Sequence, residues 1–116
     1  MRIVLNRLKE KGCNIEKALE RFFFDEELYM QCYSKLMESG EFVLVQKSIV
    51  AKEKDASLKA THTLKGVLAN LELTPMREVV LEMEALIKIE SWQEANRKCM
   101  ELMEMKSVYR NILQES

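Results

Sequence analysis

Proline occurs once and glycine three times among the 116 residues, so the chain has few of the residues that form the tight turns of a β-rich fold. Helix-favouring leucine, methionine, glutamate, lysine and alanine are frequent instead. A chain of this length is long enough for one domain with a buried core and too short for two. The composition therefore predicts a single all-α domain.

Several classes of function lack the sequence features that they require. Acidic and basic residues are interleaved and the formal net charge is −1, so there is no basic stripe for nucleic-acid binding. No apolar run approaches the length of a membrane-spanning helix, and charges interrupt the N-terminus after three apolar residues, unlike in a signal peptide. We expect no nucleic-acid partner and no membrane insertion of this segment.

The three cysteines, Cys13, Cys32 and Cys99, are widely spaced and include no CxxC pair. Metal binding by cysteine and histidine needs clustered ligands, which this spacing does not supply. We interpret the cysteines as reduced thiols of a cytoplasmic protein that serve as small buried hydrophobic residues. No metal and no cofactor is expected.

Capping residues and hydrophobic periodicity divide the chain into helices. Five residues can begin a helix: Asn14, Asp25, Asp55, Pro75 and Ser91. The expected helices are 15–23, 26–38, 41–54, 56–73, 75–90 and 92–113. Residues 1–11 form either a short amphipathic helix, which Gly12 ends, or the tail of a linker.

The segment 41–54 contains FVLV, which alone would suit a strand. Its continuation and the lack of a partner strand elsewhere favour a helix. Several amphipathic helices with short connections predict an antiparallel four-helix bundle with additional short helices at the N-terminus. We expect residues 1–12 to be an N-terminal extension or linker and residues 13–116 to be the bundle domain.

The only histidine, His62, lies on the expected helix 56–73, on the side away from the core. The core side of that helix is expected to consist of Ala60, Leu64, Val67 and Leu71, flanked by Ser57 and Leu68. The residues around the histidine are Leu58, Lys59, Lys65, Gly66 and Ala69. This outward face is therefore small and basic, with one larger apolar neighbour.

Helical side chains lean toward the N-terminus, so the residue at i+4 covers the surface beside residue i. Gly66 occupies that position and leaves His62 uncovered, although glycine costs a helix about 1 kcal/mol relative to alanine. Lys65, at i+3, can place an ammonium beside the ring. These features suit an anion-binding site. The alternative is an exposed histidine without a function, which on geometry alone is the commoner case.

The residues that follow His62 resemble the characteristic stretch of the histidine phosphotransfer (HPt) domains of two-component phosphorelays. That stretch runs H-x-L-K-G and closes a few residues later on an aliphatic-glycine-aliphatic sequence. Here residues 62–66 read HTLKG and residues 69–73 read ANLEL. Glu72 therefore stands where the family usually has glycine. We expect it to affect partner choice or the geometry of the turn without abolishing activity.

The likeness extends beyond this stretch to about residues 14–113. Met83 and Glu84 lie 21 and 22 residues after the histidine, where the family often carries a Leu-Glu-like pair. Residues 15–38 are similar to the N-terminal helices of bacterial members. The resemblance implies the helical-bundle fold and a role in phosphoryl transfer.

The resemblance also implies a mechanism. His62 would take a phosphoryl group from an aspartyl phosphate on a receiver domain and pass it to the aspartate of another. Lys65 would pair with the phosphoryl oxygens as a point charge, and Gly66 would let the partner approach. Glu84 would accept the proton of Nδ1, the alternative being an ordinary solvated glutamate. Such a domain has no ATP site or metal of its own, and is a phosphocarrier rather than an autonomous kinase.

The implied partners are receiver domains of response regulators or of a hybrid sensor histidine kinase. Their docking surface is expected to include Leu58, Lys59, Lys65, Gly66 and Ala69. Two other functions stay open. One is a helical adaptor that keeps the bundle and binds partners without chemistry. The weaker one is a kinase-linked dimerisation module, in which an acidic residue usually follows the histidine, whereas Thr63 follows it here.

Overall fold

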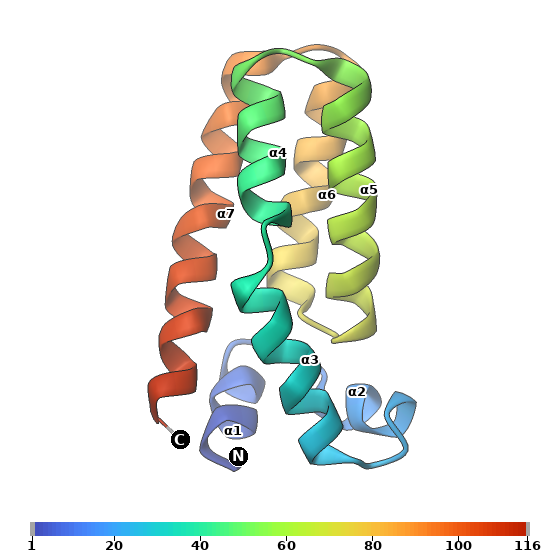
Figure 1. Ribbon diagram of the computed structural model, residues 1–116, viewed down its shortest axis with the longest axis vertical. Helices are drawn as coiled ribbons and strands as arrows, with labels where there is room; N and C mark the ends of the chain where they lie inside the picture. The colour runs from blue at the N-terminus through green and yellow to red at the C-terminus, as the bar shows by residue number, and fades with distance from the viewer. Residues whose placement is uncertain (1, 116) are drawn as a thin grey trace.

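The computed structural model describes residues 2–115, and within this range the chain forms helices and no strand (Figure 1), which confirms the all-α prediction. Met1 and Ser116, the outer ends of the two segments expected from the sequence, lie outside the described residues. The helices are α1 (Arg2–Glu10), α2 (Ile15–Arg21), α3 (Glu26–Glu38), α4 (Glu41–Val50), α5 (Lys54–Asn70), α6 (Thr74–Lys88), α7 (Trp92–Ile112) and the short 3₁₀ helix η1 (Leu113–Glu115).

Helices α4, α5, α6 and α7 form a bundle in which each helix contacts the next and α7 packs against α4. The three connections within it, residues 51–53, 71–73 and 89–91, are each three residues long, so neighbouring helices run in opposite directions. Helix α3 continues the column of α4 and also contacts α7 (Figure 1). Helices α1 and α2 lie at the α3 end of the bundle.

All three bundle connections end the preceding helix in the same way. Their middle residues, Lys52, Glu72 and Glu90, have φ of 57°, 54° and 55°, in the left-handed region that glycine tolerates best. In each connection the amide of the next residue donates to a carbonyl five residues back, as in the Schellman motif, for example from Leu73 to Leu68 at 3.0 Å. Glu72 therefore occupies a glycine-like position, and two other charged residues of this chain do the same.

Two of the predicted helix caps are confirmed. The carboxamide oxygen of Asn14 accepts a hydrogen bond from the Lys17 amide at 3.1 Å, and a carboxylate oxygen of Asp25 accepts one from the Leu28 amide at 3.0 Å. The prediction for Asp55 is wrong, because α5 begins at Lys54 and Asp55 lies within its first turn. A carboxylate there still interacts favourably with the positive end of the helix.

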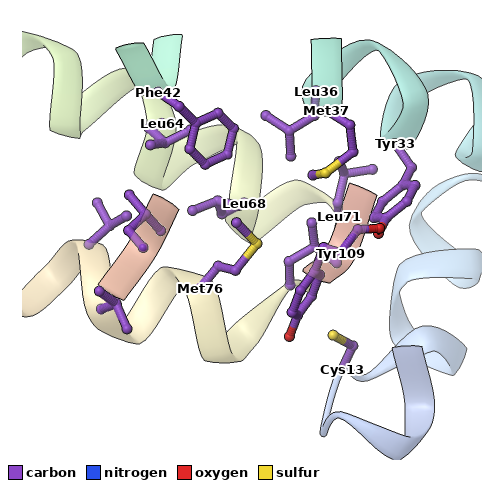
Figure 2. Close-up of a cluster of buried hydrophobic side chains, with 14 of the residues drawn as sticks. Cys13, Tyr33, Leu36, Met37, Phe42, Leu64, Leu68, Leu71, Met76 and Tyr109 are labelled. Carbon is purple, nitrogen blue, oxygen red and sulfur yellow. The ribbon is translucent and has the colours of Figure 1, made fainter. Parts of the chain in front are cut away.

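The core runs along the bundle and extends to the α1–α3 end (Figure 2). Phe42 of α4 and Leu64 of α5 meet in the bundle part. At the other end the buried hydroxyls of Tyr29 and Tyr33 donate to the carbonyls of Leu71 and Tyr109 at 2.8 and 2.5 Å. Burial of these polar groups is thus matched by hydrogen bonds.

Residues 2–10 form a packed amphipathic helix, as one of the two sequence-based alternatives predicts. Val4, Leu5 and Leu8 of α1 are almost fully buried, and Gly12 ends the helix region with a φ of 97°. Arg7 also pairs with Glu115 at 2.8 Å, joining α1 to the C-terminal turn. Helix α1 is therefore part of the same core as the bundle.

Candidate functional site

His62 lies in the middle of α5 with its side chain exposed to solvent. Within residues 2–115 the imidazole makes no hydrogen bond and no ion pair, so both ring nitrogens are available to a visiting group. The buried face of α5 on the opposite side consists of Ser57, Ala60, Thr61, Leu64 and Leu68. The outward position predicted for the histidine is confirmed.

One expectation about this helix is wrong. Val67, expected in the core, is 36% exposed, whereas Thr61 is fully buried. The Thr61 hydroxyl donates to the Ser57 carbonyl at 2.9 Å, so a small polar side chain can enter the core with its hydrogen bond made. Compared with the core face expected from the sequence, the observed core face of α5 includes Thr61 and excludes Val67.

The other residues expected around His62 surround it on the same helix. Lys59 and Gly66 are exposed, and Leu58, Lys65 and Ala69 are partly buried. A Cβ atom added to Gly66 would have no neighbour within 4 Å. No packing among residues 2–115 requires glycine at this position, and the space beside Gly66 stays open.

Lys65 and Glu84 are close together, and the Lys65 ammonium is paired with this carboxylate. Lys65 Nζ is 3.2 and 3.1 Å from the two carboxylate oxygens of Glu84, which also lies 3.8 Å from the Nζ of Lys88. The Glu84 side chain is only 15% exposed, so a carboxylate there needs a cationic partner. This need accounts for the contact between Lys65 and Glu84. The direction of helical side chains alone predicted only that Lys65 would lean toward His62.

The C-terminus of α5 carries a second interaction, which the sequence did not indicate. Arg21 of α2 donates to the carbonyls of Ala69 and Asn70 at 2.9 and 3.0 Å and to a carboxylate oxygen of Glu72 at 3.0 Å. The guanidinium thereby satisfies carbonyls that have no partner at a helix end. Because about fifty residues separate Arg21 from these partners, local sequence patterns could not reveal the contact.

No group of three or more His, Cys, Asp and Glu side chains within residues 2–115 is placed to hold a metal ion. None of the described helices has the length and apolar character needed to cross a membrane.

Comparison with known proteins gives one match. The family model described as the Hpt domain matches residues 15–115, nearly the whole chain. No curated protein and no solved structure gives a significant match.

Proposed function

We propose that this chain, which belongs to the Hpt domain family, relays a phosphoryl group between aspartates of receiver domains through a phosphohistidine at His62. Membership of the family supports a phosphotransfer role in two-component signalling. The observation that carries the finer proposal is the open imidazole: His62 is exposed, makes no hydrogen bond within residues 2–115, and has free space beside it at Gly66.

The chemistry asks little of the chain besides positioning and charge. The Nε2 lone pair of the neutral imidazole attacks the phosphorus of the aspartyl phosphate. The N–P bond forms as the P–O bond to the receiver's aspartate breaks, and the aspartate leaves as a carboxylate. The same steps in reverse, with another receiver, pass the group on. The receivers would supply the Mg²⁺ and the remaining catalytic groups.

In this proposal Lys65 and Glu84 respond to the incoming charge. The Lys65 ammonium lies about 3 Å from the Glu84 carboxylate. The phosphoryl group carries more negative charge than this carboxylate and therefore attracts the ammonium more strongly. A lysine side chain is flexible enough to turn from one to the other. Glu84, still near Lys88, is then free to accept the proton of the imidazole Nδ1. In this way Lys65 can pair with the phosphoryl oxygens and Glu84 can accept the Nδ1 proton, the two roles that the family resemblance implies.

The docking surface in this proposal is the outward face of α5 formed by Leu58, Lys59, Lys65, Gly66 and Ala69. It combines partly buried apolar atoms with one exposed and one partly buried lysine, as a transient interface of modest size requires. The three cysteines are free thiols, which suits a cytoplasmic protein.

Relay can be tested with two receivers from the same organism. The chain is incubated with a receiver that carries labelled aspartyl phosphate, and a second, unlabelled receiver is added later. We expect label to appear on the chain and then on the second receiver at the expense of the first. His62→Gln should take no label, whereas Thr63→Ala, a change at the neighbouring exposed residue, should behave like the wild type. Binding of receivers without any transfer would instead favour the adaptor.

A further inference from the structure

A pocket of about 270 Å³ opens where α2 meets the C-terminus of α5 and the N-terminus of α6. Its walls are formed by Lys17, Arg21, Leu68, Ala69, Glu72, Thr74 and Arg77. The first two residues come from α2 and Arg77 comes from α6. Three cationic side chains thus line this pocket, which we call the basic pocket.

The single carboxylate in the basic pocket does not balance its positive charge. Glu72 is bonded to Arg21 at 3.0 Å and lies 4.0 Å from the Nζ of Lys17, which is largely exposed. The guanidinium of Arg77 makes no hydrogen bond and no ion pair with any residue in the range 2–115, and its Nε is buried without a partner. The pocket therefore offers unused donors and net positive charge to an anion.

Helix α2 sorts its charges between two sides. Lys17 and Arg21, one turn apart, face the basic pocket, whereas Glu16 and Glu20 line a separate hollow beside Phe24. A randomly charged surface helix would mix the two signs on each side. The segregation strengthens the positive character of the pocket.

The basic pocket lies on the same side of the α5–α6 pair as His62. Ala69 lines the pocket and follows the histidine by seven residues, which is two helical turns or about 10 Å. Arg77 precedes Glu84 by the same interval on α6, so these two side chains share a face. An interface of about 800 Å² per partner has a radius of roughly 16 Å. A receiver centred on His62 would therefore cover the pocket.

We propose that the basic pocket, whose wall at Ala69 lies two helical turns along α5 from His62, binds a carboxylate side chain of the receiver docked at His62 and so selects among receivers. This inference rests on the proposed function. A carboxylate on a docked protein fits better than a free anion, because Lys17 is exposed and Ala69 belongs both to the pocket and to the proposed docking surface. Electrostatic complementarity at such a distance affects partner choice and association rather than the chemical step.

The test measures the affinity of receivers for the full chain by titration, with Arg77→Met compared with Arg97→Met. Methionine keeps an apolar stem and removes the charge in both variants. Arg97 is an exposed residue of α7, without an ion pair in the described range. For a cognate receiver we expect Arg77→Met to weaken binding about tenfold, the scale of one charge-assisted hydrogen bond. Arg97→Met should change it less than about twofold.

Two further measurements separate docking from stability and from chemistry. Lys17→Met, at an exposed position, should also weaken binding, and Arg77→Lys should restore most of the affinity. The rate of transfer at saturating receiver should stay within about twofold of the wild type in all these variants. The proposed role of the basic pocket would be overturned if Arg77→Met and Arg97→Met bound the receiver with equal affinity. It would also be overturned if the receiver did not bind the wild-type chain. If His62 takes no label but Arg77→Met still weakens receiver binding, the proposed relay function would be overturned and the proposed role of the basic pocket would stand.

Discussion

At the scale of single residues, the site depends on which anion Lys65 pairs with. In the structure its partner is Glu84, at 3.1 Å, and in the proposed reaction it is the phosphoryl group. Lys88 lies 3.8 Å from the same carboxylate but is largely exposed and comes from α6 itself. The two lysines therefore share one partner, but only Lys65 lies on the same helix as His62, one turn after it, which makes Lys88 the control for Lys65.

Lys65→Met should slow transfer at saturating receiver by about tenfold to a hundredfold, because the phosphoryl group loses a charge-assisted contact. Lys88→Met should leave that rate within about threefold. Single-turnover kinetics measure both. The free energy of unfolding should fall by no more than about 1 kcal/mol in either variant, since the other lysine remains beside Glu84 and partly exposed ion pairs stabilise weakly. A similar loss of rate in both lysine variants would show that Lys65 has no special role.

The buried thiols predict how stability responds to alkaline pH. Burial raises the pKa of Cys13 and of Cys99 to about 11, from an ordinary value of 9.0. Between about pH 9 and 11 the unfolded chain therefore binds fewer protons than the folded chain, and the free energy of unfolding falls as the pH rises. Below about pH 8 both states keep the thiol protons and these groups have no effect.

Urea denaturation at a series of pH values tests this expectation. The wild type should be equally stable at about pH 7 and 8 and progressively less stable above about pH 9. Burial also raises the pKa of Tyr29, Tyr33 and Tyr109, which adds to the loss at higher pH. A Cys13→Ala, Cys99→Ala double variant should lose stability less steeply just above pH 9. Identical slopes for the two proteins would contradict the assignment to the thiols.

At the scale of elements, the backbone conformation of Glu72 is not unusual for this protein. It shares the left-handed position with Lys52 and Glu90, so these turns tolerate a side chain. What distinguishes Glu72 is the bond to Arg21, which links α2 to the end of α5. The family's glycine would make the turn easier and would leave Arg21 without its carboxylate.

Glycine substitutions separate these two effects. Glu90→Gly should raise the free energy of unfolding by about 0.5–1 kcal/mol, because the left-handed backbone is no longer strained and no described contact is lost. Glu72→Gly should give no net gain, since the contact with Arg21 is worth about 1 kcal/mol. Urea denaturation of both variants measures the difference. An equal gain in both would mean that the Arg21 contact contributes nothing.

The sequence was sufficient for features that depend on near neighbours. Periodicity predicted the helices, including α4 despite its FVLV stretch, and the caps at Asn14 and Asp25 follow from residue type alone. The outward position of His62 required only the helical repeat. Contacts between distant elements could not be predicted in this way. The pairing of Lys65 with Glu84 depends on how α5 and α6 pack, and that of Arg21 with Glu72 on where α2 lies.

At the scale of the whole molecule, the role of α1 can be measured. The expected boundary made residues 1–12 an extension or linker, and the family match begins at residue 15. Yet Leu5 and Leu8 are among the most buried side chains of the protein. We propose that the folding unit includes α1, whereas the functional domain boundary stays where the sequence places it.

Leu8→Ala should lower the free energy of unfolding by about 2–4 kcal/mol, because it removes a fully buried side chain from the core. Ile3→Ala, at an exposed position on the same helix, should change it by less than about 0.5 kcal/mol. Deletion of residues 1–10 should destabilise the protein more than Leu8→Ala does. Unchanged stability after the deletion would show that α1 is a separate extension.

The most direct test of the central claim locates the phosphoryl group on the chain. The full chain is incubated with a phosphorylated receiver and then mapped by mass spectrometry at neutral or alkaline pH, where phosphohistidine survives. The proposed function predicts a phosphoryl group on His62 that is lost after brief exposure to acid. A phosphoryl group on Thr61 or Thr63, or a chain that stays unmodified with every receiver that binds it, would contradict the claim.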